Sequence, residues 1–156
     1  MDSTKSNLVT AASMQMRVEI LSYKSDCLRG VLYNLYLDAP YEFTCLVQMI
    51  LKMERIFNSQ GFPEASMTPR VFIPPNNAGE KPKAGGNSFI DNTMTSKTPA
   101  EPGVAKCTFE IDVKFRRNAT WQGQIIWVER NLKQSFRSVL EMLKLMDEAL
   151  NVNGAT

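Results

Sequence analysis

Residues 107–116 read Cys-Thr-Phe-Glu-Ile-Asp-Val-Lys-Phe-Arg, and this stretch decides the fold. Its apolar and polar side chains alternate strictly, a pattern typical of a β-strand with one buried and one solvated face. A turn at residues 116–120 leads into a second apolar stretch, residues 121–129. The hairpin register that follows pairs Phe115 with Trp121, Val113 with Gly123, Ile111 with Ile125 and Phe109 with Trp127. All these side chains then share one face, and a slip of one residue would break that agreement.

A helix is expected directly after this hairpin. Ser135 is placed to cap its first turn, because a serine hydroxyl accepts from an early backbone N–H. Apolar residues then recur at helical spacing. They are Phe136, Val139, Leu140, Leu143, Met146 and Leu150. The sequence therefore predicts a strand–strand–helix unit over residues 105–151.

The same unit is predicted once more, at residues 13–58. A shift of 93 positions (30 to 123) aligns the two stretches without a gap, as an internal repeat would. The identical pairs are Gly30/Gly123, Phe43/Phe136, Met49/Met142, Met53/Met146 and Asn58/Asn151. The apolar residues of the first helix are Phe43, Leu46, Val47, Ile50, Met53 and Phe57. Pro40 is tolerated in its first turn, and Gly61 ends it. The match predicts an internal duplication.

The rest of the chain differs in composition. A polar leader (residues 1–12) precedes the first repeat, a segment rich in proline, glycine and asparagine (residues 59–104) separates the repeats, and a short tail (residues 152–156) follows. Such a separating segment is typical of a flexible linker. One hairpin with one helix is marginal by itself. We therefore expect one compact α+β domain, in which two tandem β-β-α repeats form one four-stranded antiparallel sheet with two helices on one face.

The composition excludes several chemistries. Apolar residues make up 44% and charged residues 22%, as in globular proteins, and a net charge of +2 predicts neither nucleic acid nor a membrane as partner. The chain has no histidine, which excludes histidine-based catalysis and metal binding. Its three cysteines are far apart and form no CxxC pair, so neither a zinc site nor a disulfide framework is expected. The N-terminus lacks the apolar stretch of a signal peptide. We expect a cytoplasmic protein that is not an enzyme and needs no metal or cofactor.

The outer face of the predicted sheet is the first candidate site. It carries the apolar residues Val31, Tyr33, Leu35, Ile126 and Val128. Contiguous exposed apolar patches are typical of interaction sites, so this face predicts a binding, adaptor or regulatory protein with a protein partner or a homodimer. In the alternative interpretation, linker residues 71–73 (Val-Phe-Ile) fold over this face and cover it.

The turn of the second repeat is the alternative site. Its candidate residues are Arg116, Arg117, Asn118, Gln122 and Arg137. Guanidinium groups recognise phosphate, and Arg137, in the first turn of the expected helix, would assist anion binding there. Residues 118–123 (Asn-Ala-Thr-Trp-Gln-Gly) resemble the second half of the cyclic-di-GMP motif of PilZ domains, although no RxxxR segment precedes them. The alternative function is therefore a sensor of a small molecule or nucleotide, and the alternative to both is an ordinary solvated surface.

Three segments of the second repeat carry a further resemblance. They read Asn-Ala-Thr-Trp-Gln-Gly-Gln (118–124), Gln-Ser-Phe-Arg-Ser-Val-Leu-Glu-Met (134–142) and Leu-Met-Asp-Glu-Ala-Leu (145–150). This pattern resembles small uncharacterised proteins of Firmicutes-type bacteria. Residues 51–57 and 61–66 are similar to segments of related short bacterial proteins. The resemblance implies a bacterial or phage cytoplasmic protein and supplies no activity, ligand or site residue.

Overall fold

The computed structural model describes residues 14–24, 27–68, 70–72 and 105–154. The first half contains β1 (Gln15–Lys24), β2 (Cys27–Tyr33), β3 (Tyr41–Phe43) and helix α1 (Leu46–Gln60). The second half contains β4 (Cys107–Phe115), β5 (Gln122–Trp127), a short 3₁₀ helix η2 (Val128–Arg130), β6 (Leu132–Phe136) and helix α2 (Val139–Gly154). The order β-β-β-α therefore occurs twice.

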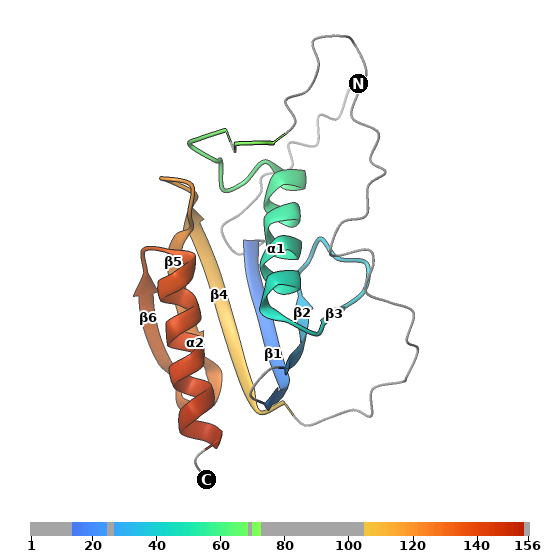
Figure 1. Cartoon of the computed structure of the whole chain (residues 1–156), viewed down its shortest axis with the longest axis vertical. Helices are drawn as coiled ribbons and strands as arrows, with labels where there is room; N and C mark the ends of the chain where they lie inside the picture. Colours follow the sequence, from blue (N-terminus) through green and yellow to red (C-terminus); the bar gives the residue numbers. More distant parts are fainter. Residues whose placement is uncertain (1–13, 25–26, 69, 73–104, 155–156) are drawn as a thin grey trace, which may run out of the picture.

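The strands form one six-stranded antiparallel sheet in the order β3-β2-β1-β4-β5-β6. The two halves meet at its centre, where β1 pairs with β4. Both helices lie on the same face of the sheet, α1 over the strands of the first half and α2 over those of the second (Figure 1). The predicted class, an α+β protein with one antiparallel sheet and two helices, is confirmed. The predicted number of four strands is wrong, because a short third strand precedes each helix.

The two extra strands change the roles of several residues. Phe43 and Phe136, expected in the first turns of the helices, are the last residues of β3 and β6. Ser135, the expected cap, lies within β6, and Pro40 lies before β3 rather than in a helical turn. In short edge strands of this kind few side chains are buried, so the alternation that marks a strand is weak.

The start of α2 is instead fixed by Ser138. Its hydroxyl oxygen accepts from the Glu141 backbone N–H at 3.1 Å, and the Glu141 carboxylate accepts from the Arg137 backbone N–H at 2.7 Å. This arrangement differs from a standard capping box in one respect, because Glu141 bonds to the N–H of the residue before the cap, Arg137, and not to that of Ser138 itself. Helix α1 ends at Gly61 as predicted, with a left-handed φ of 64°.

The register of the second hairpin is largely as predicted. The confirmed pairs are Val113 with Gly123, Ile111 with Ile125 and Phe109 with Trp127. The fourth pair is wrong: Phe115 lies opposite Gln122 and not opposite Trp121, because the register shifts after Val113. This bulge turns Phe115 outward, where it is 48% exposed, whereas Trp121 is buried.

Both halves use the same register. The β1–β2 pairing shifts between Ile20 and Ser22, and the β4–β5 pairing shifts at the positions 93 residues later, between Val113 and Phe115. Gly30 lies between Ile20 and Phe43 across its three strands, as Gly123 lies between Val113 and Phe136. A Cβ on Gly30 would stand 2.5 Å from the Phe43 ring, and one on Gly123 would meet the Asp112 carbonyl. Neither site has room for a side chain.

The core lies between the sheet and the helices. Alternate residues of the central strands β1 and β4 point into it, among them Met16, Val18, Phe109 and Ile111. The helices add methionines at matched places, which are Met49 and Met53 in α1 and Met142 and Met146 in α2. Within the described ranges, neither helix is long and apolar enough to cross a membrane.

Candidate functional site

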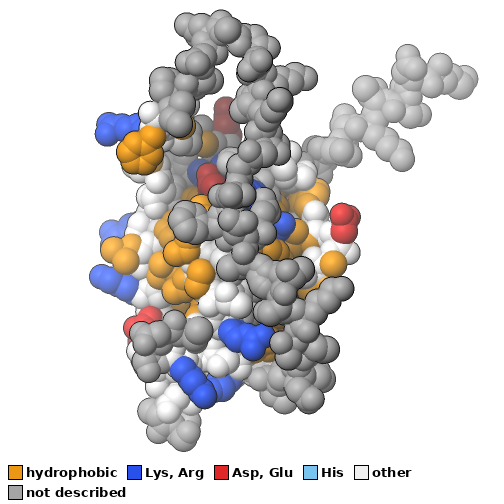
Figure 2. Space-filling view, turned by 45° about the vertical axis from the view of Figure 1, so that its right-hand side comes forward, with side chains coloured by type: hydrophobic (Ala, Val, Ile, Leu, Met, Phe, Trp, Pro, Cys, Tyr) orange, Lys and Arg blue, Asp and Glu red, His pale blue; other side chains and the backbone are white. Residues whose placement is uncertain are grey.

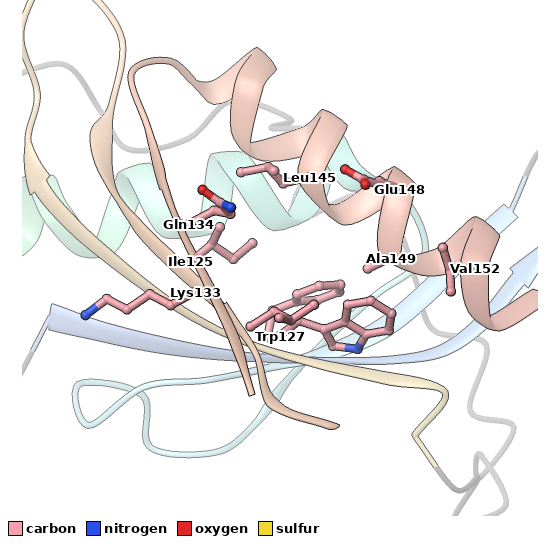
Figure 3. Close-up of a pocket in the computed structure, with 10 residues that line it drawn as sticks. Ile125, Trp127, Lys133, Gln134, Leu145, Glu148, Ala149 and Val152 are labelled. Atoms are coloured by element: carbon pink, nitrogen blue, oxygen red, sulfur yellow. The ribbon is translucent and has the colours of Figure 1, made fainter. Parts of the chain in front are cut away.

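A groove of about 190 Å³ lies between α2 and the edge of the sheet formed by β5 and β6 (Figure 3). The residues that line it are Phe109, Ile125, Trp127, Leu132, Lys133, Gln134, Leu145, Glu148, Ala149 and Val152. Most of these side chains are apolar. Because an apolar cavity of about 150 Å³ in a protein holds a benzene molecule, the groove has room for one large apolar side chain.

Strand alternation and helical spacing build the two walls of this groove. On β6, Leu132 and Gln134 alternate with Lys133. Figure 3 shows the Gln134 side chain on the side of α2, whereas the Lys133 ammonium extends away from that helix. Phe136, which is buried, fixes the far end of β6, while Leu132 remains 56% exposed. On α2, the lining residues 145, 148, 149 and 152 recur at the spacing of one helical stripe. The groove therefore follows from β6 and α2 being consecutive elements.

Three polar groups accompany the apolar lining. The Gln134 amide and the Glu148 carboxylate have no hydrogen-bond partner among the described residues. The indole N–H of Trp127 is buried and is also without a partner within the described ranges. Above its ring, the Arg130 guanidinium carbon lies 4.9 Å from the ring centroid. A buried N–H without a partner costs free energy, on the order of 1–3 kcal/mol, which an added acceptor would recover.

One edge of β6 is open. It pairs with β5 on one side, and in the described part of the chain no strand pairs with its other side. Residues 132–135 are all exposed. In an antiparallel strand every second residue turns its N–H and C=O away from a given neighbour, so β6 presents unpaired donors and acceptors along its outer edge.

In the first half the corresponding gap between helix and edge strand is filled by two side chains. A shift of 93 positions places Tyr41 where the second half has Gln134, and Lys52 where it has Leu145. There the Lys52 ammonium lies 4.9 Å from the centroid of the Tyr41 ring, so these two side chains stand against each other across the helix–strand gap. Pro40, which corresponds to Lys133, has no N–H to offer a further strand. Strand β3 is also only three residues long.

The structure does not gather the predicted sheet-face residues into one patch. Val31 and Tyr33 lie on β2 and Ile126 lies on β5, but Leu35 lies beyond the end of β2 and Val128 lies in η2. Val31 is itself buried.

Charged residues separate these apolar side chains on the outer face. Tyr33 pairs with Arg17, Arg17 with Glu110, and Glu110 with Ile126, so two charged residues lie between Tyr33 and Ile126. The Arg17 guanidinium forms an ion pair with Glu19 at 3.1 Å, and the Tyr33 hydroxyl donates to the same carboxylate at 3.1 Å. Desolvation and this hydrogen bond raise the pKa of Tyr33.

The described residues 71 and 72 do not support the alternative in which residues 71–73 cover this face. Val71 is 61% exposed and Phe72 is fully exposed, while residue 73 lies outside the described ranges. Hydrophobic side chains also reach the surface elsewhere: Figure 2 shows them in the middle of one face of the molecule, with lysine and arginine side chains beside and below them. At the groove such side chains flank an open strand edge.

Arg116, a candidate for anion binding, is a buried structural residue. Its guanidinium bonds to Glu54 at 2.9 Å and to Asn58 at 2.7 Å, and its Nε donates to the Pro63 carbonyl. Trp121 donates from its indole N–H to the second Glu54 oxygen at 2.8 Å. This cluster forms one side of a wider cleft of about 600 Å³ between α1, the start of α2 and the β4–β5 turn. The arginine therefore joins the second hairpin to α1.

The other four candidates of the turn do lie close together. The Gln122 side chain accepts from the Arg117 N–H at 3.0 Å and donates to the carbonyls of Arg117 at 2.9 Å and Arg137 at 3.3 Å. Asn118 adopts a left-handed φ of 56° in the turn itself. The Arg117 guanidinium stacks on Phe115, and that of Arg137 is 90% exposed and approaches Glu141 at 3.5 Å. Gln122 thus joins the backbones of Arg117 and Arg137 at the surface.

Comparison with known protein families, curated proteins and solved structures found no match to this chain. In the part of the chain that the structure describes, no cluster of three or more histidine, cysteine or acidic side chains could hold a metal ion.

Proposed function

We propose that this protein is a non-catalytic binding protein that recognises another polypeptide at the groove between α2 and β6. The observation that carries the proposal is an open strand edge beside an apolar groove. Proteins bind extended peptides in this way, because the edge supplies backbone hydrogen bonds and the adjoining pocket selects a side chain.

This location differs from the outer sheet face predicted from the sequence. That face would serve the same class of function, but its exposed ion pairs and hydrogen bonds favour contact with water, and exposed ion pairs contribute little to binding or stability. The groove combines apolar lining with unsatisfied backbone groups, and both gain from a partner.

The two surfaces can be separated with matched leucine variants. A library of random peptides is selected on the immobilised full-length protein, on its Leu132→Asp variant and on its Leu35→Asp variant. Leu132 and Leu35 are both exposed, at 56% and 80%, so both variants are expected to stay folded, which circular dichroism checks. We expect peptides that bind the parent protein and the Leu35→Asp variant but not the Leu132→Asp variant. Peptides that bind the parent protein and the Leu132→Asp variant but not the Leu35→Asp variant would assign the function to the sheet face. A folded protein that enriches no peptide would contradict the proposal.

A second function is supported by two exposed arginines, Arg117 and Arg137, whose backbones Gln122 joins. A sensor of a phosphate-bearing small molecule would use Arg117, Asn118, Gln122 and Arg137. Nucleotide added at about 100 times Kd should then raise the free energy of unfolding by about 2.7 kcal/mol. The combined variant Arg117→Ala/Arg137→Ala should lose this gain. Arg116 is left unchanged, because its removal would destabilise the fold.

We also propose that the two halves arose by duplication of one unit. The shared register, the bulge at matched positions and the paired buried methionines support this origin. A fragment of residues 105–156 would then expose the edge of β4 that normally pairs with β1. We expect this fragment to be unstable alone or to dimerise, and a stable monomer with a sharp thermal transition would argue against the idea.

A further inference from the structure

Resting on the proposed function, we infer that the partner is an extended segment with alternating apolar and acidic side chains, which pairs with β6 as an additional strand of the sheet. The open outer edge of β6, the groove beside it and the basic charge along it together define this chemistry.

The edge determines the conformation of the partner. The outward N–H and C=O groups of β6 recur at every second residue, and only another extended chain matches that repeat. Strand β6 has five residues, Leu132–Phe136, so a partner segment of similar length pairs along all of it.

The two sides of β6 determine the alternation. Partner side chains that lie beside Leu132 and Gln134 point toward α2, where the groove accepts an apolar group. Partner side chains beside Lys133 and Ser135 point to the opposite face of the sheet, because neighbouring strands keep their side chains in register. Apolar residues are therefore required at every second position of the partner.

Charge determines the intervening positions. Residues 129–137 contain three basic side chains, Arg130, Lys133 and Arg137, and one acidic side chain, Glu129. Lys133 forms no ion pair with any described residue, and its ammonium extends away from α2 (Figure 3). An aspartate or glutamate beside Lys133 therefore gains a favourable cross-strand pair.

The same charges argue against a second copy of this chain as the occupant. A pairing of β6 with β6 of another copy would bring two sets of basic residues to one joined edge. The edge at β3 is no better, since Pro40 lacks an N–H there and the Tyr41–Lys52 contact occupies the gap beside the helix. An acidic, alternating partner satisfies the β6 edge without these costs.

The test uses the full-length protein and a fluorescein-labelled peptide, Ser-Leu-Asp-Leu-Asp-Leu-Asp-Leu-Ser, with binding measured by fluorescence anisotropy. The comparison peptide has lysine in place of each aspartate. We expect the aspartate peptide to bind more tightly. Lys133→Glu should weaken it about fivefold to tenfold and should favour the lysine peptide, since an attractive cross-strand pair becomes a repulsive one. Lys114→Glu is the control, because Lys114 is an exposed lysine on the central strand β4, where it contacts Asp112 and Gln124, and should change binding less than about twofold.

Backbone pairing is tested by N-methylation of the peptide, one residue at a time. Strand addition predicts loss of binding at every second position and tolerance at the positions between. Equal sensitivity at all positions, or no effect of Lys133→Glu, would overturn the inference, while library peptides that depend on Leu132 would leave the proposed function standing.

Three further outcomes would also overturn it. A doubled mass in solution that returns to the mass of one chain in the Leu132→Asp variant would make a second copy of the protein the occupant of the β6 edge. Tighter binding of a synthetic peptide of residues 76–104, dependent on Lys133, would make the chain's own segment the occupant. If neither the probe peptide nor any library peptide binds the folded protein, the inference and the proposed function fail together.

Discussion

Replacement of Arg116 by alanine should destabilise the protein far more than its position in a surface turn suggests. The residue is 6% exposed, and its guanidinium is bonded to Glu54, Asn58 and the Pro63 carbonyl. Alanine would leave the Glu54 carboxylate with Trp121 as its one remaining hydrogen-bond donor among these groups. It would also leave Asn58 and a backbone carbonyl short of a donor.

The size of the stability loss follows from how deeply each partner of the Arg116–Glu54 ion pair is buried. Removing one partner of a fully buried pair costs about 3–5 kcal/mol. The Glu54 side chain is 34% exposed, so water compensates part of its charge, and we expect a loss of about 2–3 kcal/mol. A loss of this size lowers Tm by about 4–12 °C in a chain of this length. Arg116→Lys should retain only part of the stability, because an ammonium cannot reproduce the fork of the guanidinium.

Urea unfolding followed by far-ultraviolet circular dichroism measures this loss. Arg117→Ala is the matched control, since the neighbouring arginine is exposed and only stacks on Phe115, and it should cost less than about 1 kcal/mol. A double-mutant cycle with Glu54→Gln should show coupling of at least about 0.5 kcal/mol. If Arg116→Ala costs no more than Arg117→Ala, the assignment of Arg116 as the link between the two halves is wrong.

Three further predictions concern stability and reactivity. Gly123→Ala should lower the free energy of unfolding by about 1–3 kcal/mol, because the added methyl group would meet a backbone carbonyl of β4. Gly154 faces open space, so Gly154→Ala should change the free energy of unfolding by less than about 0.5 kcal/mol. Equal effects of the two variants in urea unfolding would contradict this prediction. Burial raises the pKa of the Cys107 thiol, so iodoacetamide should alkylate the exposed Cys45 first and Cys107 only after unfolding. Mass spectrometry of the modified peptides measures the two rates, and equal rates would refute this prediction. The Arg137 backbone N–H donates to the Glu141 carboxylate and holds the pKa of Glu141 below its usual value, so the stability that Glu141 contributes is complete above the ordinary carboxyl pKa and is lost as the pH falls through the lowered pKa. Glu141→Gln should remove this part of the pH dependence of the urea midpoint, and an unchanged dependence would count against this role of Glu141 at the start of α2.

The sequence predicted the elements whose burial is periodic. In β4 the buried residues Phe109, Ile111 and Val113 alternate with the half-buried Glu110 and Asp112, and each correct cross-strand pair of the hairpin followed from that alternation. The bulge after Val113 left no such signal, because Val113, Lys114 and Phe115 continue the apolar–polar alternation of the sequence through it. The bonds that join Arg116 to α1 were missed as well. A contact between residues so far apart in sequence has no local signature.

The edge strands and the groove were missed for one common reason. Strand β6 has four exposed residues and one buried phenylalanine, and Phe136 stands four positions before Leu140, which imitates helical spacing. With β6 assigned to the helix, no edge and no groove could be inferred. The spacing of Ser138 and Glu141, Ser-x-x-Glu, was the available signal that the helix begins later.

The pairing of β1 with β4 affects how the chain folds and where it can vary. Every other strand pairing in the sheet is a local hairpin, whereas Ile20 pairs with Cys107, 87 positions later in the chain (20 to 107). Closing that loop is the entropically costly step, and the local hairpins should form before it. Yet the cost grows only with the logarithm of the separation, so doubling it adds about 0.6 kcal/mol. The connection between the halves is therefore the place where this fold can accept an inserted domain at little cost in stability.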